Sequence, residues 1–333
     1  MSGARKTVLI LPPLQLHEGA RAMLEAEVEL VDGASLDADG LAAALARAHG
    51  LVGAVSADQV RAAPDLEVIG MPGSGWDMID VDAATAAGVL VVNAAGAQHA
   101  AVAEHGIGLM LSLAKRIAYS DRIFHAERRF VGREHFMGDG WPGWAHELSG
   151  STVGIVGFGF IGRDLARKCR LGFDMTVLTY DPFFDPDEAL RMGVRPMGSL
   201  AELLPQCDYV TLHVPLTEST RHLFGEAELR AMKPTAYLVN LARGGIVDED
   251  ALIRALTEGW IAGAGLDVFA EEPGPDGHPL YGMENVVCTA HIGGWVLEAV
   301  PRLSAVMARE MLTVLRGERP WRVVNPEARK TRE

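Results

Sequence analysis

The sequence predicts an α/β protein with two doubly wound parallel sheets, and three observations support this prediction. Short apolar, β-branched runs alternate with alanine-rich helical segments along the chain. The 333 residues exceed one typical domain and suit two. A long helical stretch, expected from about Ala100 to Glu127, separates the first group of strands from the second. We therefore expect a chain that starts in one domain, crosses into another and returns at its C-terminus.

The first domain is assigned to residues 1–101 and 297–333. Its expected strands are Thr7–Leu11, Val28–Val31, Gly50–Val55, Glu67–Met71 and Val89–Val92, with helices such as Leu41–Ala48 and Ala83–Ala87 between them. Because strands that alternate with helices imply crossover connections, this sheet should be parallel. Helical periodicity returns over Leu297–Leu315, whereas the polar tail, Asn325–Glu333, is expected to be loosely held.

The second domain is assigned to residues 102–296. Its α/β pattern begins at Thr152, after an irregular connection over Arg128–Gly150 that is rich in Gly, Trp and His. Its expected strands are Val153–Val156, Met175–Tyr180, Asp208–Val214, Ala236–Leu241, Gly263–Val268 and Asn285–Thr289. Such apolar runs are typical of strands buried on both faces.

A glycine turn, Gly157-Phe158-Gly159-Phe160-Ile161-Gly162, joins the first of these strands to a helix. Gly157 would permit the tight turn, Gly159 the close approach of a pyrophosphate, and Gly162 the packing of helix on strand. The phosphates would then lie at the helix N-terminus. Asp181 ends the next strand, at a spacing that suits an acid on the ribose diol and favours NAD over NADP. An ordinary structural turn is the alternative, but the strands, helix and acid together favour a dinucleotide site.

Composition and charge restrict the class of protein. A net charge of −14 gives no nucleic-acid footprint and would be repelled by an anionic membrane. No apolar run approaches the ~18 residues of a membrane span, and the first strand is not a signal peptide. Cys169, Cys207 and Cys288 lack metal-ligand spacing, so we expect reduced core thiols and no metal. We expect a cytoplasmic protein.

Three polar groups follow successive strands of the second domain: Arg243, the pair Glu271-Glu272, and His291. Ligands of open α/β sheets bind at the carboxyl ends of the strands. Hydride transfer between nicotinamide and a 2-hydroxy acid needs a proton at the hydroxyl oxygen, which a histidine can move near neutral pH. A carboxylate can orient the imidazole, and an arginine can bind the substrate carboxylate in two-point geometry. Singly, such residues are more often structural, but their matched positions favour catalysis.

At these residues the sequence resembles the D-isomer-specific 2-hydroxyacid dehydrogenases, the family of phosphoglycerate dehydrogenase and glyoxylate/hydroxypyruvate reductase. The resemblance spans nearly the whole chain, through Gly73–Asp77, Val102–His105, Val153–Gly162, His213–Leu216, Asn240–Gly245, Gly265–Phe269 with Glu272-Pro273, and His291–Gly294. It implies a Rossmann NAD-binding domain inserted in a flavodoxin-like substrate-binding domain. It also implies NAD-dependent interconversion of a D-2-hydroxy acid and its 2-oxo acid.

The resemblance implies a role for each matching residue. Arg243 and the backbone of Ser74 and Gly75 would bind the substrate carboxylate, Glu272 would support His291, and His291 would be the acid/base. The residues expected to contact the cofactor are Val102, Gly157, Gly159, Phe160, Ile161, Gly162, Asp181, His213, Val214, Pro215, Thr220, Leu241, Ala242, Asp267, His291, Gly293 and Gly294. For Asp267 the alternative is a role in satisfying the backbone at its strand end.

Several points stay open in the sequence. Relatives of this kind include NAD-sensing corepressors without catalysis, and formate or phosphite oxidation on the same fold is a further alternative. The family is typically dimeric, and the helix near Glu104–Glu127 is the expected interface. The substrate's identity depends on pocket residues, for which the candidates are His99, His135, Trp141, Trp144 and Trp295. As aromatic groups, the tryptophans could equally belong to the core or to a dimer contact.

Overall fold

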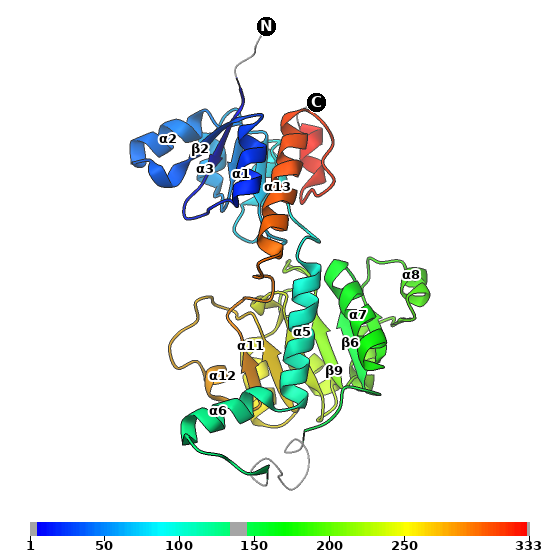
Figure 1. Cartoon of the computed structure of the whole chain (residues 1–333). Helices are drawn as coiled ribbons and strands as arrows, with labels where there is room; N and C mark the ends of the chain where they lie inside the picture. The colour runs from blue at the N-terminus through cyan, green and yellow to red at the C-terminus, as the bar shows by residue number, and fades with distance from the viewer. Residues whose placement is uncertain (1–4, 134–144, 332–333) are drawn as a thin grey trace. The chain divides into compact units, whose positions relative to one another are not determined.

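The computed structural model describes residues 5–133 and 145–331, which divide into two compact units (Figure 1). The first unit contains the described residues up to Gln98 and from Trp295 onward, and the second contains His99–Gly294. The chain therefore leaves the first unit once and returns to it once. The predicted domain boundaries, after residues 101 and 296, lie within three residues of these divisions.

The described part of the first unit contains one five-stranded parallel sheet in the order β2-β1-β3-β4-β5. The strands are β1 (Thr7–Ile10), β2 (Glu29–Asp32), β3 (Gly50–Val52), β4 (Val68–Met71) and β5 (Leu90–Asn93). This is the flavodoxin-like order, in which the chain reverses direction across the sheet at β1 and β3. The predicted fold class is confirmed for this unit.

Helices cover both faces of this sheet. They are α1 (Glu18–Glu25) and α13 (Ala299–Leu315) on one face, and α2 (Ala38–Ala46), α3 (Ala57–Ala62) and α4 (Val81–Ala86) on the other. The side chains of a strand alternate between faces, so Val8 and Ile10 pack with α13 while Leu9 packs with α2 and α3. Gly70 lets α13 pack close to β4, because an added Cβ would meet both Met307 and Met311.

In the second unit, the described residues form a seven-stranded parallel sheet in the order β12-β11-β10-β9-β6-β7-β8. The strands are β6 (Thr152–Val156), β7 (Thr176–Tyr180), β8 (Arg195–Pro196), β9 (Tyr209–Leu212), β10 (Tyr237–Asn240), β11 (Gly263–Leu266) and β12 (Val286–Cys288). The strand order reverses beside β6, as in dinucleotide-binding folds. This confirms the predicted Rossmann domain.

The helices of the second unit also lie on both faces of its sheet. One face carries α5 (His99–Ala114) and α7 (Phe160–Phe173), and the other carries α9 (Leu200–Leu203), α10 (Glu226–Ala231) and α11 (Glu249–Thr257). Two shorter helices, α8 (Pro186–Arg191) and α12 (Pro279–Gly282), lie in connections. Each unit thus has hydrophobic clusters built from its own residues.

The long helix predicted over residues 100–127 is two helices. Helix α5 ends at Ala114, and α6 runs over Ile117–Glu127. Between them Arg116 is left-handed, with a φ of 54°, and its guanidinium lies 4.2 Å from the centre of the Tyr119 ring. The backbone N–H of His146 donates to the Ala114 carbonyl and caps the end of α5. Neither glycine nor proline marks the break, so periodicity alone predicted one helix.

The described part of the C-terminal tail is anchored, which corrects the expectation of a loose segment. A 3₁₀ helix covers Pro326–Thr331, and Asn325 before it is fully buried. The Asn325 amide oxygen accepts a hydrogen bond from the Val91 N–H at 2.7 Å, and its NH₂ donates to the Val89 carbonyl and the Thr85 hydroxyl, both at 2.9 Å. One polar side chain therefore attaches the tail to the start of β5.

The three cysteines differ in their surroundings. Cys169 and Cys207 are free, buried thiols, as predicted, and burial raises the pKa of each to about 12. Cys288 is exposed, so the prediction of a core thiol is wrong for that residue. It ends the short strand β12, which is an edge strand of its sheet. Within the described residues, no helix combines the length and the apolar character needed to cross a membrane.

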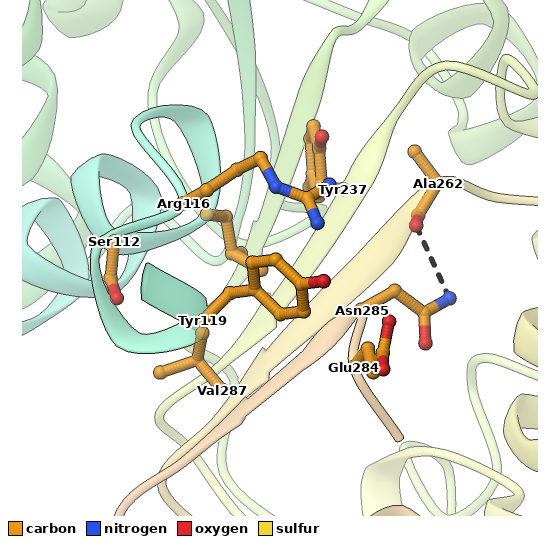
Figure 2. Close-up of a pocket in the computed structure, with 9 residues that line it drawn as sticks. Ser112, Arg116, Tyr119, Tyr237, Ala262, Glu284, Asn285 and Val287 are labelled. Atoms are coloured by element: carbon orange, nitrogen blue, oxygen red, sulfur yellow. Dashed lines mark hydrogen bonds between the residues drawn. The ribbon is translucent and has the colours of Figure 1, made fainter. Parts of the chain in front are cut away.

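A cavity of about 260 Å³ lies at the amino ends of β10, β11 and β12 (Figure 2). Tyr237 begins β10, and Ala262 and Asn285 directly precede the other two strands. Arg116 and Tyr119, from the break between α5 and α6, also line it. Residues that follow the strands lie at the opposite end of the sheet, so this cavity is separate from the strand-end residues considered next.

Candidate active site

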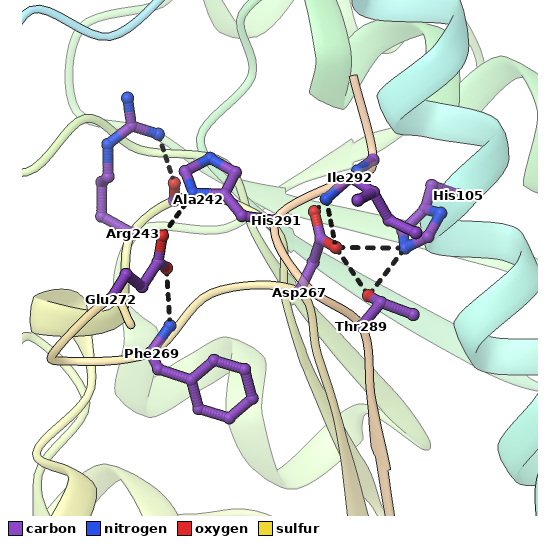
Figure 3. A network of polar contacts seen from close by, with 10 residues as sticks. His105, Ala242, Arg243, Asp267, Phe269, Glu272, Thr289, His291 and Ile292 are labelled. Carbon is purple, nitrogen blue, oxygen red and sulfur yellow. Dashed lines mark hydrogen bonds and ion pairs between the residues drawn. The ribbon is translucent and has the colours of Figure 1, made fainter. Parts of the chain in front are cut away.

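The second unit brings Arg243, Glu272 and His291 to the carboxyl edge of its sheet. Arg243 follows β10 closely, Glu272 lies in the loop after β11, and His291 lies beyond the end of β12. These strands are parallel neighbours, so their carboxyl ends meet at one edge. Figure 3 shows the three side chains gathered there.

His291 and Glu272 form a close pair. The His291 Nδ1 lies 2.6 Å from Glu272 Oε2, and Glu272 Oε1 accepts a hydrogen bond from the Phe269 N–H at 2.9 Å. A carboxylate only accepts, so Nδ1 is assigned the proton and Nε2 is left for exchange with a ligand. The two side chains are 45% and 36% exposed, so they are accessible in this unit.

The backbone at His291 adopts a left-handed conformation that the neighbouring Asp267 holds. The φ of His291 is 54°, which is unusual for a residue other than glycine. Its N–H donates to the Asp267 carbonyl at 2.7 Å. The Asp267 carboxylate accepts from the N–H groups of Ile292 at 3.0 Å and Gly293 at 2.8 Å. An added Cβ on Gly293 would lie 2.9 Å from that carboxylate, so the turn requires glycine.

Two residues that sequence reasoning missed complete this network. The Thr289 hydroxyl donates to Asp267 Oδ1 at 2.6 Å, and His105 Nε2 lies 2.9 Å from the same hydroxyl. His105 Nε2 is also 3.4 Å from Asp267 Oδ1. His105 comes from α5, so this helix is tied to the loop that carries His291 (Figure 3). The only sequence signal was the position of His105 in one of the family-like motifs.

The environment keeps Asp267 ionised although it is only 2% exposed. Burial acts to raise the pKa of its carboxyl group, but the hydrogen bonds from His105, Thr289 and the Gly293 and Ile292 N–H groups outweigh it and bring the pKa to about 2. Asp267 therefore does satisfy backbone groups at its strand end, the alternative role that the sequence suggested.

Arg243 is held by a turn that Asn240 organises. The Asn240 side chain accepts from the Ala242 N–H at 3.0 Å and donates to the Arg243 carbonyl at 2.9 Å. The guanidinium is half-buried, and its Nη1 donates to the Ala242 carbonyl at 2.6 Å. An added Cβ on the next residue, Gly244, would collide with the backbone of Phe269. The arginine turn and the start of the Glu272 loop are therefore in direct backbone contact.

The glycine turn has the geometry that a dinucleotide requires. Gly157 has a φ of 96°, and an added Cβ would lie 2.8 Å from the backbone of His213. An added Cβ on Gly162 would collide with the Gly157 carbonyl, whereas beside Gly159 there is open space. Helix α7 begins after Gly159 with no side-chain cap and no acidic residue in its first turn. The helix start is thus suited to an anion.

Asp181 lies at the edge of this turn. Its carboxylate accepts from the N–H of Phe158 at 2.8 Å and from the N–H of Phe183 at 2.9 Å. The first bond fixes the acid against the glycine turn, and the second shapes the loop after β7. Phe183 itself is almost fully exposed beside it. The acid thus lies at the end of the second strand of this sheet in chain order, beside the glycine turn.

The loop after β9 contains His213, Val214, Pro215 and Thr220. His213 Nε2 lies 3.0 Å from the Thr211 hydroxyl, and burial lowers the pKa of His213 to about 4, so its imidazole is neutral. The Thr220 hydroxyl donates to the Pro215 carbonyl at 2.6 Å and holds the loop closed. The backbone at His213 and Val214 packs against Gly157, so this loop and the glycine turn are adjacent.

The other predicted residues are distributed as follows. In the first turn of α7, Phe160 is half-exposed and Ile161 is partly buried. Ala242 and Gly294 are also partly buried. Val102 and Leu241 are buried in a hydrophobic cluster of the second unit. Ser74 and Gly75 lie in the first unit, after β4, where the Ser74 carbonyl accepts from Asn93 at 2.8 Å. His99 begins α5 and Trp295, in the first unit, is exposed. His135, Trp141 and Trp144 lie outside the described residues. In the described ranges, no cluster of metal-ligating side chains is present.

Comparisons with known proteins agree with this geometry. Residues 107–293 match the family model for the NAD-binding domain of D-isomer-specific 2-hydroxyacid dehydrogenases. The chain is 40% identical to D-3-phosphoglycerate dehydrogenase of Methanocaldococcus jannaschii over 324 residues, 96% of this chain but only 59% of that protein. It is 41% identical to glyoxylate reductase of Thermofilum pendens over 278 residues, 84% of this chain and 80% of that one.

Solved structures agree as well. The holo form of D-mandelate dehydrogenase from Rhodotorula graminis superimposes with a TM-score of 0.84 at 29% identity, over 97% of this chain and 98% of that one. The likeness extends over both units. The chain therefore belongs to the D-isomer-specific 2-hydroxyacid dehydrogenase family and is an NAD-dependent oxidoreductase.

Proposed function

We propose that the protein interconverts a D-2-hydroxy acid and its 2-oxo acid, with His291 as the acid/base, Glu272 as its support and Arg243 as the ligand of the substrate carboxylate. The observation that carries this proposal is the 2.6 Å contact between His291 and Glu272, next to Arg243, at the carboxyl edge of a dinucleotide-binding sheet. A charged imidazole can donate a proton to the substrate oxygen, and a neutral one can remove it.

Each residue has a defined task in this scheme. When bound, the nicotinamide supplies the hydride to C2 of the 2-oxo acid or accepts it from the 2-hydroxy acid. In reduction, His291 Nε2 delivers a proton to O2, and the Glu272 carboxylate stabilises the imidazolium before transfer. Arg243 binds the substrate carboxylate in two-point geometry. The N–H groups of Ser74 and Gly75, which donate to no group of the described residues, would complete that carboxylate site.

The cofactor contacts are proposed from the same geometry. The pyrophosphate would lie over Gly159 and the start of α7, with Val102, Leu241, Ala242 and Gly294 as further surroundings of the cofactor. The Asp181 carboxylate would bind the ribose hydroxyls and repel a 2′-phosphate. No cation follows it in Pro182–Phe184, which supports a preference for NAD. Asp267 would reach the nicotinamide carboxamide.

The substrate is proposed to be a small 2-oxo acid, such as glyoxylate or hydroxypyruvate, or a phosphoglycerate-type 2-hydroxy acid. The support is the names of five similar relatives, of which three are glyoxylate reductases and two are D-3-phosphoglycerate dehydrogenases.

We also propose that the protein is a cytoplasmic homodimer that associates through α6. This helix buries none of its residues in the described structure. It exposes Ile117 and Phe124, and Phe130 just beyond it is 81% exposed. Exposed apolar groups on a helix that buries none of its residues support an interface. Light scattering of the purified protein would reveal a monomer if this proposal is wrong.

The test of the reaction is NADH oxidation against a panel of 2-oxo acids. His291→Ala should lower kcat by ~10²–10⁴-fold, because it removes the proton donor. Glu272→Gln should also lower kcat, whereas the adjacent Glu271→Gln is the matched control and should retain activity. Equal losses in the two glutamine variants would contradict the assignment of Glu272.

The alternatives have distinct outcomes in the same assay. NADH binding without turnover of any 2-oxo acid would support an NAD-sensing protein of the corepressor type. Reduction of NAD with formate or phosphite as the hydride donor would instead support a formate or phosphite dehydrogenase on the same fold. Turnover only of bulkier oxo acids would keep the reaction class and overturn the proposed substrate.

A further inference from the structure

A second carboxylate–histidine pair lies at the base of the loop that carries Glu272. Glu249 Oε1 lies 2.9 Å from His278 Nε2, and Glu249 Oε2 accepts a hydrogen bond from the Ala270 N–H at 3.1 Å. The two side chains are mostly buried, with 21% and 13% exposed. Glu249 is the first residue of α11, and Ala270 and His278 flank the loop of residues 271–277. One carboxylate therefore binds both ends of that loop.

The histidine has a defined tautomer when it is neutral. His278 Nδ1 accepts a hydrogen bond from the Leu280 N–H at 3.3 Å, so Nε2 carries the proton and donates it to Glu249. Its ring lies 5.1 Å from the ring of Tyr281, which in turn lies 5.4 Å from that of Phe269. The aromatic contacts therefore join the same two ends of the loop that Glu249 joins.

The same region touches the turn that carries Arg243. Gly244 packs so tightly on the backbone of Phe269 and Ala270 that no Cβ fits there. Glu249 follows this turn along the chain and accepts a hydrogen bond from the Ala270 N–H. The start of the Glu272 loop is thus held between Gly244 and Glu249. The turn that carries Arg243 and the loop that carries Glu272 are therefore in contact at this point.

We propose that Glu249 and His278 are positioning residues, which fix the Glu272 loop so that the His291–Glu272 pair stays aligned with Arg243. The inference rests on the proposed function of those three residues. Glu272 needs such support because it is exposed and lies in a loop with Gly274 and Gly277. Within the described residues its side chain forms hydrogen bonds only with the Phe269 N–H and His291. Displacement by ~1 Å at a reacting group can cost 10²-fold in rate.

The kinetic test is a double-mutant cycle between Glu249 and Glu272. Glu249→Ala should lower kcat by ~10–100-fold through misplacement of the loop, with an unchanged Kd for NADH. Glu249→Gln should lower kcat less, because the amide oxygen can still accept a hydrogen bond from the Ala270 N–H. In a Glu272→Gln background, Glu249→Ala should have almost no further effect on kcat, because residues that act as a unit are not additive.

The matched control is Glu226→Gln. Glu226 lies on α10 and forms ion pairs with Arg230 and with Arg254 of α11, neither of which belongs to the loop. The Glu226→Gln substitution should leave kcat unchanged. A fall equal to that of Glu249→Ala would show general destabilisation instead of positioning. Fully additive losses in the cycle would likewise overturn the inference, because Glu249 would then not act through Glu272.

A second measurement does not depend on activity. Amide hydrogen exchange over residues 269–272 should become faster in Glu249→Ala than in the wild type, and His278→Gln should do the same to a smaller extent. The rest of the second unit should keep its protection. Unchanged exchange would overturn the inference even in an active enzyme. If the wild type reduces no 2-oxo acid but exchange is still faster in Glu249→Ala, the proposed function is overturned. The role of Glu249 in holding the loop is then still supported.

Discussion

Protonation of the Asp267 carboxylate should lower the free energy of unfolding. Its pKa is about 2 in the folded chain and 3.8 in its usual state. A lowered pKa contributes stability that is complete above the unfolded value and is lost as the pH falls through the folded value. The free energy of unfolding of the wild type relative to Asp267→Asn should therefore be about 1 kcal/mol smaller at pH 3 than at pH 7.

Urea unfolding of both proteins across this pH range measures the difference. The Asp267→Asn variant is the reference for the wild type, because the asparagine side chain does not titrate. A difference that stays constant between pH 7 and pH 3 would show that Asp267 titrates with its usual pKa, and that the donors around it do not stabilise its charge.

Residues of the site divide into those that a sequence can reveal and those that it cannot. Arg243 and His291 were predicted because each stands just beyond an apolar strand, where ligands of parallel sheets bind. His105 and Thr289 were missed because their contact joins positions far apart in the chain. The pair of Glu249 and His278 was missed for the same reason. No local pattern indicates which distant polar groups will meet.

Among the elements, the glycine turn offers a test that separates binding from folding. There is open space around the position of an added Cβ on Gly159, and its φ is −76°, which alanine adopts readily. Gly159→Ala should therefore keep the thermal stability of the wild type. Because the methyl group would occupy the place of the pyrophosphate, the Kd for NADH should rise by ~10-fold or more.

Isothermal titration with NADH and a melting curve for each protein provide the two readouts. Gly162→Ala is the contrasting variant, since its Cβ would collide with the Gly157 carbonyl and should destabilise the fold itself. Unchanged NADH affinity in Gly159→Ala would place the cofactor elsewhere.

The end of helix α7 should be open to stabilisation. Asp174 caps this helix in a left-handed conformation with a φ of 51°. Glycine adopts this conformation without a Cβ penalty, and an acid is unfavourable at the negative end of the helix dipole. Asp174→Gly should therefore raise the free energy of unfolding by about 1 kcal/mol.

Asp174→Ala is the control for this substitution, because it removes the charge but retains the left-handed strain. Chemical denaturation should rank the glycine variant above both alanine and wild type. If alanine stabilises as much as glycine, the charge alone explains the effect and the backbone conformation contributes nothing.

The elements followed the sequence where hydrophobic pattern decides structure. Buried strands such as β6 and β10 were predicted because apolar, β-branched runs leave few other options. The break between α5 and α6 was not predicted, since Arg116 adopts a left-handed conformation with no local signal. Tertiary contacts, including the Tyr119 ring and the N–H of His146, fix that break instead. The anchoring of the tail by Asn325 is equally a long-range effect.

At the scale of the whole molecule, the two units have separate cores. Each hydrophobic cluster draws its residues from one unit, and each sheet is covered on both faces by helices of its own unit. A chain limited to residues 99–294 should therefore fold and bind NADH with an affinity comparable to that of the full chain.

Circular dichroism and NADH titration of this shortened chain test the expectation, and its Gly159→Ala version is the negative control for binding. An unfolded or aggregated product would show that the second unit depends on the first for its stability. A folded product without affinity for NADH would assign part of the cofactor site to the first unit.

The anchored tail has a consequence for the behaviour of the molecule in concentrated solution. Strand β5 is the last strand of its sheet, and its outer side would otherwise present unpaired backbone groups. Val323 forms an antiparallel bridge with Val92, and the Val324 N–H donates to the Val91 carbonyl at 2.9 Å. The chain end therefore shields an edge that could pair with another molecule. A protein shortened before Val323 should lose that shield and become prone to edge-to-edge aggregation.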